Sequence, residues 1–514
     1  MTKTDAHSNE ADEILASLPS GLRAIADTPR VRIRRRGVPA SGAKSVVYWI
    51  ERAQRGVDNP ALDCAIEVAN ELGLPVVAFF SAIANFPRAN LRHYAFLNQG
   101  LHDVEEEMAA RGVPLIVRRP PENKLEPFLQ QVGAGIVIGD ENPLREPERW
   151  RRVLAGRLKI PFWTVDADVI VPSRLFTKGF YAQHLFRRQL DPLLSEYLVE
   201  PIAPTLAKPW PRTKVERWIL DDDITKGWRN FDRRVKPVDT FRGGSHAALE
   251  RLRYFVEHQL ADYEQARRKP QINGTSQLSP YLHFGHISPL RIALEVRRAV
   301  DAGKAPQSAY DAYINELVGW RELAVNFVTY ARDTYDTVEC AEPWAQKTLR
   351  EHLRDRRGYD YTYEQLERGE THDPLWNAAQ LQMVRYGWMH NVLRMYWGKK
   401  ILEWSPNPAR AFEWAVLLND TYELDGRDPN SYAGIAWAIA GKFDRPWFER
   451  EIFGTIRYMS GASTGKKFDS RLYMALVANP EMAKEQLFSA ARRIWEGTPS
   501  PSSIPLIACK QFNP

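Results

Sequence analysis

The stretch SVVYWIERAQRGVDNPALDCAIEVANELGLPVVAFF, residues 45–80, decides how the first part of this chain folds. Two apolar runs rich in β-branched and aromatic residues, 45–50 and 75–80, flank a segment at 61–73. Apolar residues recur in that segment with helical periodicity, and it ends at a glycine, which suits a helix C-terminus. Two strands joined by such a helix form a parallel βαβ unit.

The same alternation continues along the chain. An amphipathic segment at 97–112 comes next, and the further strand-like runs are PLIVRR (114–119), GIVIGD (135–140) and PFWTVDA (161–167). Five strands that alternate with helices predict an α/β domain over 43–175, with a five-stranded, parallel, Rossmann-like sheet. Residues 1–42, with the basic cluster RVRIRRRG, are expected to form a flexible basic extension with one short helix at 11–18.

The second half of the chain has a different pattern. Residues 176–245 include a proline-rich, acidic stretch with little periodicity, and we interpret them as a connector between domains. From about residue 246 helical periodicity dominates and no convincing strand follows, so we predict an all-α domain over 246–490 and a tail at 491–514. A chain of 514 residues is more consistent with two domains than with one core.

Composition excludes several classes of protein. Hydrophobic residues make up 44% and charged residues 26%, a globular balance, and no apolar run is long enough to span a bilayer. We therefore expect a cytoplasmic protein without a membrane segment. Cys64, Cys340 and Cys509 lie far apart, which argues against a disulfide framework and a cysteine-ligated metal. The net charge of +6 fits a polyanionic partner such as nucleic acid.

Three apparent ligand motifs fail on inspection. GAGIVIG at 133–139 precedes a strand where a dinucleotide fingerprint must follow one, and GASTGKK at 461–467 has the wrong spacing for a phosphate loop. His283 and His286 in LHFGH have no third ligand nearby in the sequence, so we expect packing histidines and no metal.

Polar and aromatic residues concentrate in four segments of the helical region. In SQLSPYLHFGHIS (276–288), Ser276 and Ser279 precede a helix start, where they could seat a phosphate or act as a plain helix cap. In NELVGWREL (315–323), Glu316 and Trp320 are four apart on one helical face. Such a pair could contact a base, or it could be a surface glutamate over a core tryptophan.

The third segment pairs THDPLWNAAQ (371–380) with HNVLRMYWGKKILEW (390–404). Trp397 and Trp404 lie roughly 10 Å apart along one helix, a step that suits electron hopping between indoles, although such a stripe is more often core. The fourth, LLNDTYELDGRDPNSYAGIAWAIAG (417–441), inserts several polar groups into an apolar helical region. Burying them would be costly unless a polar cofactor satisfied them, and a solvated turn is the alternative.

Together these segments resemble the class II cyclobutane pyrimidine dimer photolyases, within the photolyase and cryptochrome family. The resemblance covers about residues 44–475 and rests on the blocks YLHFGHIS, THDPLWNA, RMYWGKKILEWS and NDTYELDGRDPNSYAGIAW. It implies an N-terminal α/β antenna domain and a C-terminal helical domain that binds FAD. It also implies an antenna chromophore, for which a deazaflavin is our expectation.

The resemblance assigns roles to individual residues. The implied cofactor contacts are Tyr263, Thr275, Ser276, Gln277, Leu278, Ser279, Glu316, Trp320, Arg394, Asn419, Asp425 and Asn430. The implied DNA and substrate contacts are Arg267, Trp320, Met395, Trp437 and Arg457. Among the catalytic residues, Glu316 would hydrogen-bond the dimer and Asn419 would lie near flavin N5. Trp397, Trp376 and Trp404 would be the proximal, middle and distal members of an electron path.

The expected activity is light-driven repair of cyclobutane pyrimidine dimers by electron transfer from excited FADH⁻ to a flipped-out dimer. The substrate would be damaged duplex or single-stranded DNA, bound by a monomer without a protein partner, in a nucleoid or a nucleus. The alternatives are a cryptochrome-type blue-light photoreceptor and a (6-4) repair enzyme, and the short stretch after TIRYMS argues against a long signalling tail. The chain departs from the family at Arg268, where asparagine is common.

Overall fold

The structure, a computed structural model, describes residues 17–211, 215–218, 220 and 223–496. The first domain is built on one six-stranded sheet of order β1-β6-β5-β2-β3-β4. All neighbours pair in parallel except β1, which is antiparallel to β6 at one edge. The strands are β1 (Val31–Arg35), β2 (Ser45–Ile50), β3 (Val76–Ser81), β4 (Leu115–Arg118), β5 (Ala134–Asp140) and β6 (Phe162–Val165).

The predicted parallel α/β domain is confirmed, but the sheet has six strands where we expected five. The sixth, β1, comes from the basic cluster that we assigned to a flexible extension, so that assignment is wrong for residues 20–35, which form α2 (Ser20–Ala26) and β1. The arginines of β1 have partners: Arg34 forms ion pairs with Glu141 (2.6 Å) and Glu148 (2.8 Å). Most of the expected helix at 11–18 lies outside the described residues.

Side chains that alternate along each strand cover the two faces of the sheet. Val46 and Tyr48 of β2 point to the face covered by α3 and α4, whereas Val47 points to the face where α5 and α6 pack. The helices of this domain are α3 (Pro60–Leu72), α4 (Leu91–Ala110), α5 (Leu125–Gln131) and α6 (Arg145–Arg157).

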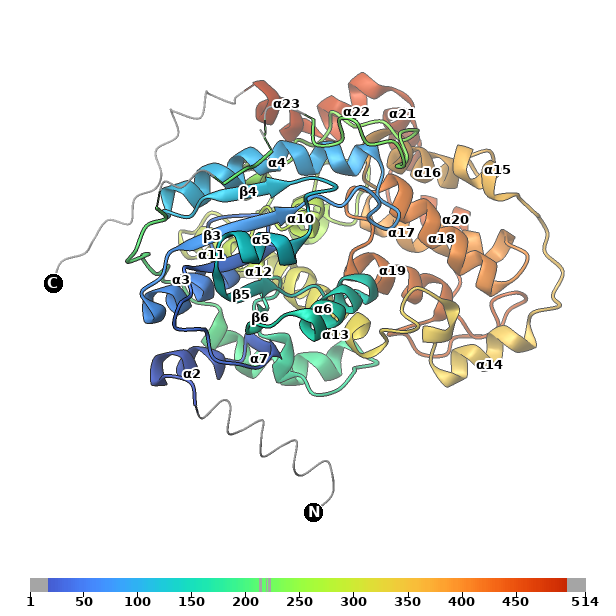
Figure 1. The fold of residues 1–514 in the computed structure, drawn as a ribbon. Coiled ribbons are helices and arrows are strands. Elements are labelled where there is room, and N and C mark those ends of the chain that lie inside the picture. The colour runs from blue at the N-terminus through green and yellow to red at the C-terminus, as the bar shows by residue number, and fades with distance from the viewer. Residues whose placement is uncertain (1–16, 212–214, 219, 221–222, 497–514) are drawn as a thin grey trace, which may run out of the picture.

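The described residues of the second domain form helices joined by irregular loops, with no strand and one isolated bridge. Figure 1 shows it beside the sheet domain, with α16 to α20 on the side away from the strands. This confirms the predicted all-α domain. Its helices are α8 (Ser245–His258), α9 (Tyr263–Ala266), α10 (Ser279–Phe284), α11 (Pro289–Asp301), α12 (Gln307–Ile314), η2 (Asn315–Trp320), α13 (Arg321–Tyr330), η3 (Val338–Cys340), α14 (Pro343–Glu351), α15 (Tyr363–Arg368), α16 (Pro374–Tyr386), α17 (Asn391–Trp404), α18 (Pro408–Tyr422), α19 (Pro429–Ala440), α20 (Gly461–Gly465), α21 (Ser470–Ala478), α22 (Pro480–Gln486) and α23 (Ser489–Glu496).

The region predicted as a connector is only partly irregular. It contains a helix of 15 residues, α7 (Gln183–Tyr197), preceded by a short turn, η1 (Ser173–Leu175). Pro192 lies inside α7, and it is one reason why the sequence pattern did not indicate a helix. No named helix or strand occurs in the described residues between α7 and α8.

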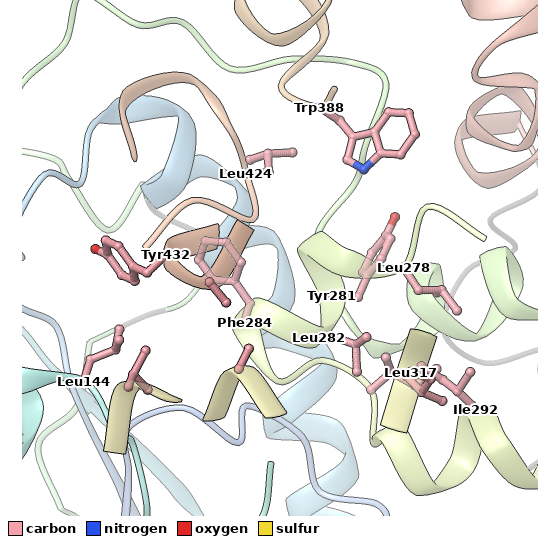
Figure 2. Close-up of a cluster of buried hydrophobic side chains, with 14 of the residues drawn as sticks. Leu144, Leu278, Tyr281, Leu282, Phe284, Ile292, Leu317, Trp388, Leu424 and Tyr432 are labelled. Atoms are coloured by element: carbon pink, nitrogen blue, oxygen red, sulfur yellow. The ribbon is translucent and has the colours of Figure 1, made fainter. Parts of the chain in front are cut away.

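The two domains meet at α10. Figure 2 shows its side chains Tyr281, Leu282 and Phe284 inside the shared apolar core, together with Trp388 of the helical domain and Leu144 of the sheet domain. The helix ends at Gly285, where φ is 71° and an added Cβ would lie 1.9 Å from the carbonyl oxygen of Arg52. Only glycine allows the backbone at residue 285 to approach the backbone of Arg52 so closely, which explains the glycine of the LHFGH motif.

Candidate cofactor and substrate site

A cavity of about 320 Å³ lies in the helical domain, within the size range of ligand pockets. Its wall is formed by the loop before α10, by η2, by α17 and by the segment from the end of α18 through α19. All twelve residues that the sequence resemblance assigned to the cofactor line this cavity: Tyr263, Thr275, Ser276, Gln277, Leu278, Ser279, Glu316, Trp320, Arg394, Asn419, Asp425 and Asn430.

One wall is a polar loop, Thr275 to Ser279. Tyr313 donates a hydrogen bond to the Ser276 hydroxyl (3.1 Å), and the indole of Trp388 donates one to the Ser279 hydroxyl (3.2 Å). These bonds fix the two hydroxyl groups at the cavity surface, where they can contact a polar ligand. Gln277 adopts a positive φ of 52°, which is uncommon for a residue with a side chain.

An arginine shared by two carboxylates forms the opposite side. Nη2 of Arg394 lies 2.9 Å from an Asp425 oxygen and 3.0 Å from Oε2 of Glu423. The Glu423 carboxylate also accepts a hydrogen bond from the backbone N–H of Met389 (3.2 Å). Burial and the neighbouring Asp425 outweigh the attraction of Arg394 and raise the pKa of Glu423 to about 8. The raised pKa favours the neutral form of this carboxyl group near neutral pH.

Aromatic side chains and Glu316, which is paired with Arg267, form a third part of the wall. The indoles of Trp320 and Trp437 stack with ring centroids 4.6 Å apart and an interplanar angle of 22°. Met395 lines the cavity as well. Nη1 of Arg267 lies 2.6 Å from Oε1 of Glu316, and this carboxylate raises the pKa of the Arg267 guanidinium. A flat apolar wall beside a charged pair is suited to binding a planar heterocycle with polar edges.

Glu316 and Trp320, which both line the cavity, lie on the π-helical turn η2. The sequence predicted an ordinary helical face, but residues 315–320 form an i to i+5 turn inside a longer helix. Such turns are frequent at functional sites because they re-aim side chains.

A buried charge cluster joins the cavity to the sheet domain. Asp428, which lines the cavity, pairs with Nη2 of Arg52 (2.5 Å) and lies 3.3 Å from His283. Arg52 follows β2, and its Nε also pairs with Asp168 (2.8 Å), which in turn binds Arg321 (2.7 Å). Arg52 holds the pKa of Asp428 far below its usual range despite burial. The sheet domain thus fixes one carboxylate of the cavity wall.

The three tryptophans of the expected electron path lie together and are buried. Trp397 lines the cavity, and its indole donates to Gln380 (2.8 Å). The indole of Trp376 donates to the carbonyl oxygen of Trp397 (3.0 Å), and the rings of Trp376 and Trp404 are 5.4 Å apart at 72°. The tryptophans therefore form a continuous series that leads away from the cavity. Their burial shows that they also serve as core.

Of the expected substrate residues, Trp320, Met395 and Trp437 line the cavity, whereas Arg267 and Arg457 do not, and Arg267 is linked to it through Glu316. Arg457 lies outside the cavity. It is exposed, and its guanidinium lies 5.3 Å from the Trp447 ring centroid. Trp447 and Phe448 are 42% and 84% exposed. Exposed aromatic rings beside arginines are typical of surfaces that contact nucleic acid.

A second cavity of about 140 Å³ lies where the carboxyl ends of β2, β3 and β5 meet helical residues. In this sheet the strand order runs outward from β2 through β3 to β4 on one side, and from β5 to β6 on the other. The order therefore reverses between β2 and β5, and the cavity lies at this topological switch point. Open α/β sheets commonly bind ligands at such a point. Apart from Nε of Arg52, which is ion-paired with Asp168, three atoms of the cavity lining are buried without a hydrogen-bond partner among the described residues: Oε1 of Glu51, Oε1 of Gln54 and Nε of Arg427. They indicate a polar ligand.

His283 and His286 have separate partners. His283 faces Asp428, as described above, whereas Nδ1 of His286 accepts a hydrogen bond from the backbone N–H of Gly244 (3.0 Å). Within the described residues no three metal-ligating side chains cluster. None of the helices in this described part of the chain has the length and apolar character needed to cross a membrane.

Comparison with known proteins identifies the family. A family model described as DNA photolyase matches residues 46–209. The chain is 41% identical over 430 residues to a deoxyribodipyrimidine photo-lyase from Methanothermobacter thermautotrophicus, covering 82% of this chain and 92% of that protein. The chain belongs to the DNA photolyase family. The predicted family and the expected enzyme class are therefore confirmed, while class II within the photolyases stays a prediction.

Solved structures show that the whole photolyase fold is present. A class III photolyase from Agrobacterium tumefaciens superposes with a TM-score of 0.66 at 20% identity, covering 89% of this chain and 90% of that one. A cryptochrome from Synechocystis gives a TM-score of 0.66 at 19% identity, covering 88% and 91%. Because both identities are low, these matches support the fold and do not distinguish a photolyase from a cryptochrome.

The cavity fits FAD, the flavin of this family. The hydroxyl-rich loop 275–279 suits a ribityl and phosphate chain, the aromatic wall suits a ring system, and Arg394 with its two carboxylates offers donors and acceptors to a polar ring edge. Sequence reasoning missed four lining residues that matter here: Met389, Trp388, Glu423 and Asp428. The last two lie inside the polar stretch 417–441, whose general signal we noted without resolving them.

Proposed function

We propose that this protein is a light-driven DNA repair enzyme that reverses cyclobutane pyrimidine dimers, of the class II type. The observation that supports this most is that one cavity is lined by the proposed flavin contacts, by the stacked pair Trp320 and Trp437, and by Glu316, which pairs with Arg267. A lesion must leave the DNA stack to reach such a cavity, as in other enzymes that act on bases.

The cofactor would be FAD, active in its reduced form, FADH⁻. Thr275, Ser276, Leu278 and Ser279 would hold its phosphate and ribityl parts, and Tyr263 would close that end. Arg394, Asp425, Asn419 and Asn430 would contact the isoalloxazine side. When bound and reduced, FAD supplies the light-excited electron that splits the cyclobutane ring.

The protein's own part is to bind and orient the lesion. Glu316 would accept or donate a hydrogen bond at the pyrimidine edge, and Arg267 would hold the Glu316 carboxylate in position through their 2.6 Å ion pair. Trp320, Trp437 and Met395 would pack against the pyrimidine rings and exclude water. Arg457, exposed beside Trp447, would enter the space that the flipped lesion leaves in the duplex.

The buried tryptophans would supply electrons to oxidised flavin in light. Trp397 is the member at the cavity, and its contacts with Trp376 and the Trp376–Trp404 ring pair give the order proximal, middle and distal. This path would restore the active redox state and would not take part in repair itself.

An antenna chromophore, which we expect to be a deazaflavin, would occupy the second cavity. The position at the switch point and the unpartnered polar atoms of Glu51, Gln54 and Arg427 support this site. A deazaflavin added to the purified protein should bind and extend the action spectrum of repair, and Arg427→Met should abolish that binding. Failure to bind would refute the assignment.

We expect damaged duplex and single-stranded DNA to be the only required partner. The net charge of +6 predicts binding that weakens with salt and is independent of sequence. The protein would act as a monomer wherever the genome lies, in a nucleoid or a nucleus.

The decisive experiment uses two oligonucleotides, one with a single thymine dimer and one with a (6-4) lesion. Each is incubated with reduced, FAD-loaded protein in blue light and in darkness, and the products are resolved by chromatography. We expect restoration of the dimer substrate only, and only in light. Repair of the (6-4) substrate, or no repair by protein that holds reduced flavin, would refute the proposal, and the second result would favour a cryptochrome-type photoreceptor.

A further inference from the structure

Arg251 is a buried cation directly behind the wall of the flavin cavity. It lies on α8, is 2% exposed, and packs beneath the Phe241 ring, with Cζ 5.2 Å from the ring centroid. Its Nη1 donates a hydrogen bond to the Gln277 side chain. The Tyr281 phenol also hydrogen-bonds the guanidinium, but no carboxylate pairs with Arg251 among the described residues. A buried guanidinium without a counter-charge is costly unless a ligand supplies one.

The charges on the cavity wall leave a diphosphate without a free cation. Apart from Glu423, whose raised pKa favours the neutral form, the charged lining residues are Glu316, Arg321, Arg394, Asp425 and Asp428, so acidic groups still outnumber basic ones. Both arginines already bind carboxylates: Arg321 binds Asp168 and Arg394 binds Asp425. The loop 275–279 contains no charged residue. Arg251, which is hydrogen-bonded to Gln277, is a positive charge in direct contact with the back of this loop.

Gln277 connects Arg251 to the cavity. Its side-chain oxygen accepts from Arg251, and its side-chain nitrogen donates to the carbonyl oxygen of Leu487 (2.7 Å). Because both polar atoms of its amide are hydrogen-bonded to residues behind the wall, the Gln277 side chain is held there, while Gln277 also lines the cavity. Gln277 has a left-handed conformation (φ 52°) and Leu278 a right-handed one (φ −89°, ψ −4°). Two successive residues with left-handed and right-handed backbone conformations point their backbone N–H groups to the same side, which forms a concave site for an anion.

We propose that Arg251 is a positioning residue that makes the cavity selective for the diphosphate of FAD over flavins without phosphate. It supplies positive charge from behind the loop and fixes Gln277 in the conformation that presents the backbone N–H groups. Because the protein interior has a low effective dielectric constant, the Arg251 guanidinium would still stabilise a bound diphosphate although Gln277 lies between them. This inference rests on the proposed flavin site.

The test measures dissociation constants of FAD and riboflavin for the flavin-free full-length chain by fluorescence titration. Arg251→Met removes the charge and keeps most of the bulk, and Arg251→Lys restores the charge. Gln277→Glu is a near-isosteric change that would neutralise Arg251 with a carboxylate. We expect Arg251→Met and Gln277→Glu to weaken FAD binding by about tenfold or more. Riboflavin affinity should change by less than about twofold, and Arg251→Lys should recover much of the FAD affinity.

Equal weakening of FAD and riboflavin would overturn the inference, since it would show a role in the fold alone. Unchanged FAD affinity in Gln277→Glu would overturn it as well, and this variant keeps the shape of the wall if Arg251→Met fails to fold. If the wild-type chain binds neither flavin, the proposed function fails. If it binds both and the variants do not alter the ratio of the two constants, only this inference fails.

Discussion

The carboxyl group of Glu423 should make the stability of the protein depend on pH in a defined range. Its pKa is raised from 4.5 to about 8, because burial and Asp425 oppose the charged form more than Arg394 favours it. The folded state therefore keeps a proton that the unfolded state loses above pH 4.5. The contribution of Glu423 to stability is largest below that pH and falls as the pH rises towards 8, by about 1.4 kcal/mol per unit in the middle of the range.

The glutamine variant isolates this effect. Glu423→Gln keeps the shape of the neutral acid but cannot ionise, so its stability should lose this dependence. Between pH 6 and pH 8 the free energy of unfolding of the wild type should fall by roughly 2 kcal/mol more than that of Glu423→Gln. Urea unfolding followed by tryptophan fluorescence measures this difference. Glu413→Gln, on the exposed face of α18, is the control and should behave like the wild type.

Infrared spectroscopy tests the same claim directly. The wild type at pH 6 should show the carbonyl band of a protonated carboxylic acid that is absent from Glu423→Gln and disappears above pH 8. Parallel pH dependence of wild type and Glu423→Gln, together with no such band, would refute the reasoning that Glu423 is neutral in the cavity wall.

Three further changes test other parts of the site. Trp397→Phe should slow photoreduction of oxidised flavin by at least about tenfold but leave repair by chemically reduced protein nearly intact. Trp414→Phe is the control and should affect neither assay. Equal loss in both assays for Trp397→Phe would refute the electron path. Glu316→Ala should lower the quantum yield of dimer repair with flavin still bound, and an unchanged yield would remove its role. Arg52→Met should lower the free energy of unfolding by about 3 kcal/mol and weaken FAD binding, because it leaves Asp428 buried with only a weak partner; a change below about 1 kcal/mol would contradict this.

The sequence predicted the parallel core of the sheet well because its strands are buried on both faces. β2 is found at the expected residues, 45–50, and β5 differs from the prediction by one residue. β1 was missed because an edge strand can be rich in charge, and its arginines gave the signal of a solvated arm. Their partners, Glu141 and Glu148, lie more than 100 residues away, so no local pattern could reveal the pairing.

The residues of the cavity were also predicted only in part. Its lining residues were predicted because long polar and aromatic blocks resemble a known family, and the structure brings the twelve proposed cofactor contacts together. Glu423 was missed because its properties depend on burial beside Arg394 and not on sequence spacing. Arg251 was missed because it contacts Gln277, 26 residues later, from behind the wall. Three-dimensional packing alone gives such residues their role.

The central claim is that flavin and lesion share one cavity. The most direct measurement is a crystal structure of the FAD-loaded protein bound to a duplex that contains one thymine dimer. The account predicts the isoalloxazine ring beside Arg394 and Asp425, with the dimer flipped out against Trp320 and Trp437 and within hydrogen-bond distance of Glu316. A dimer that remains stacked in the duplex, or a flavin bound outside this cavity, would contradict it.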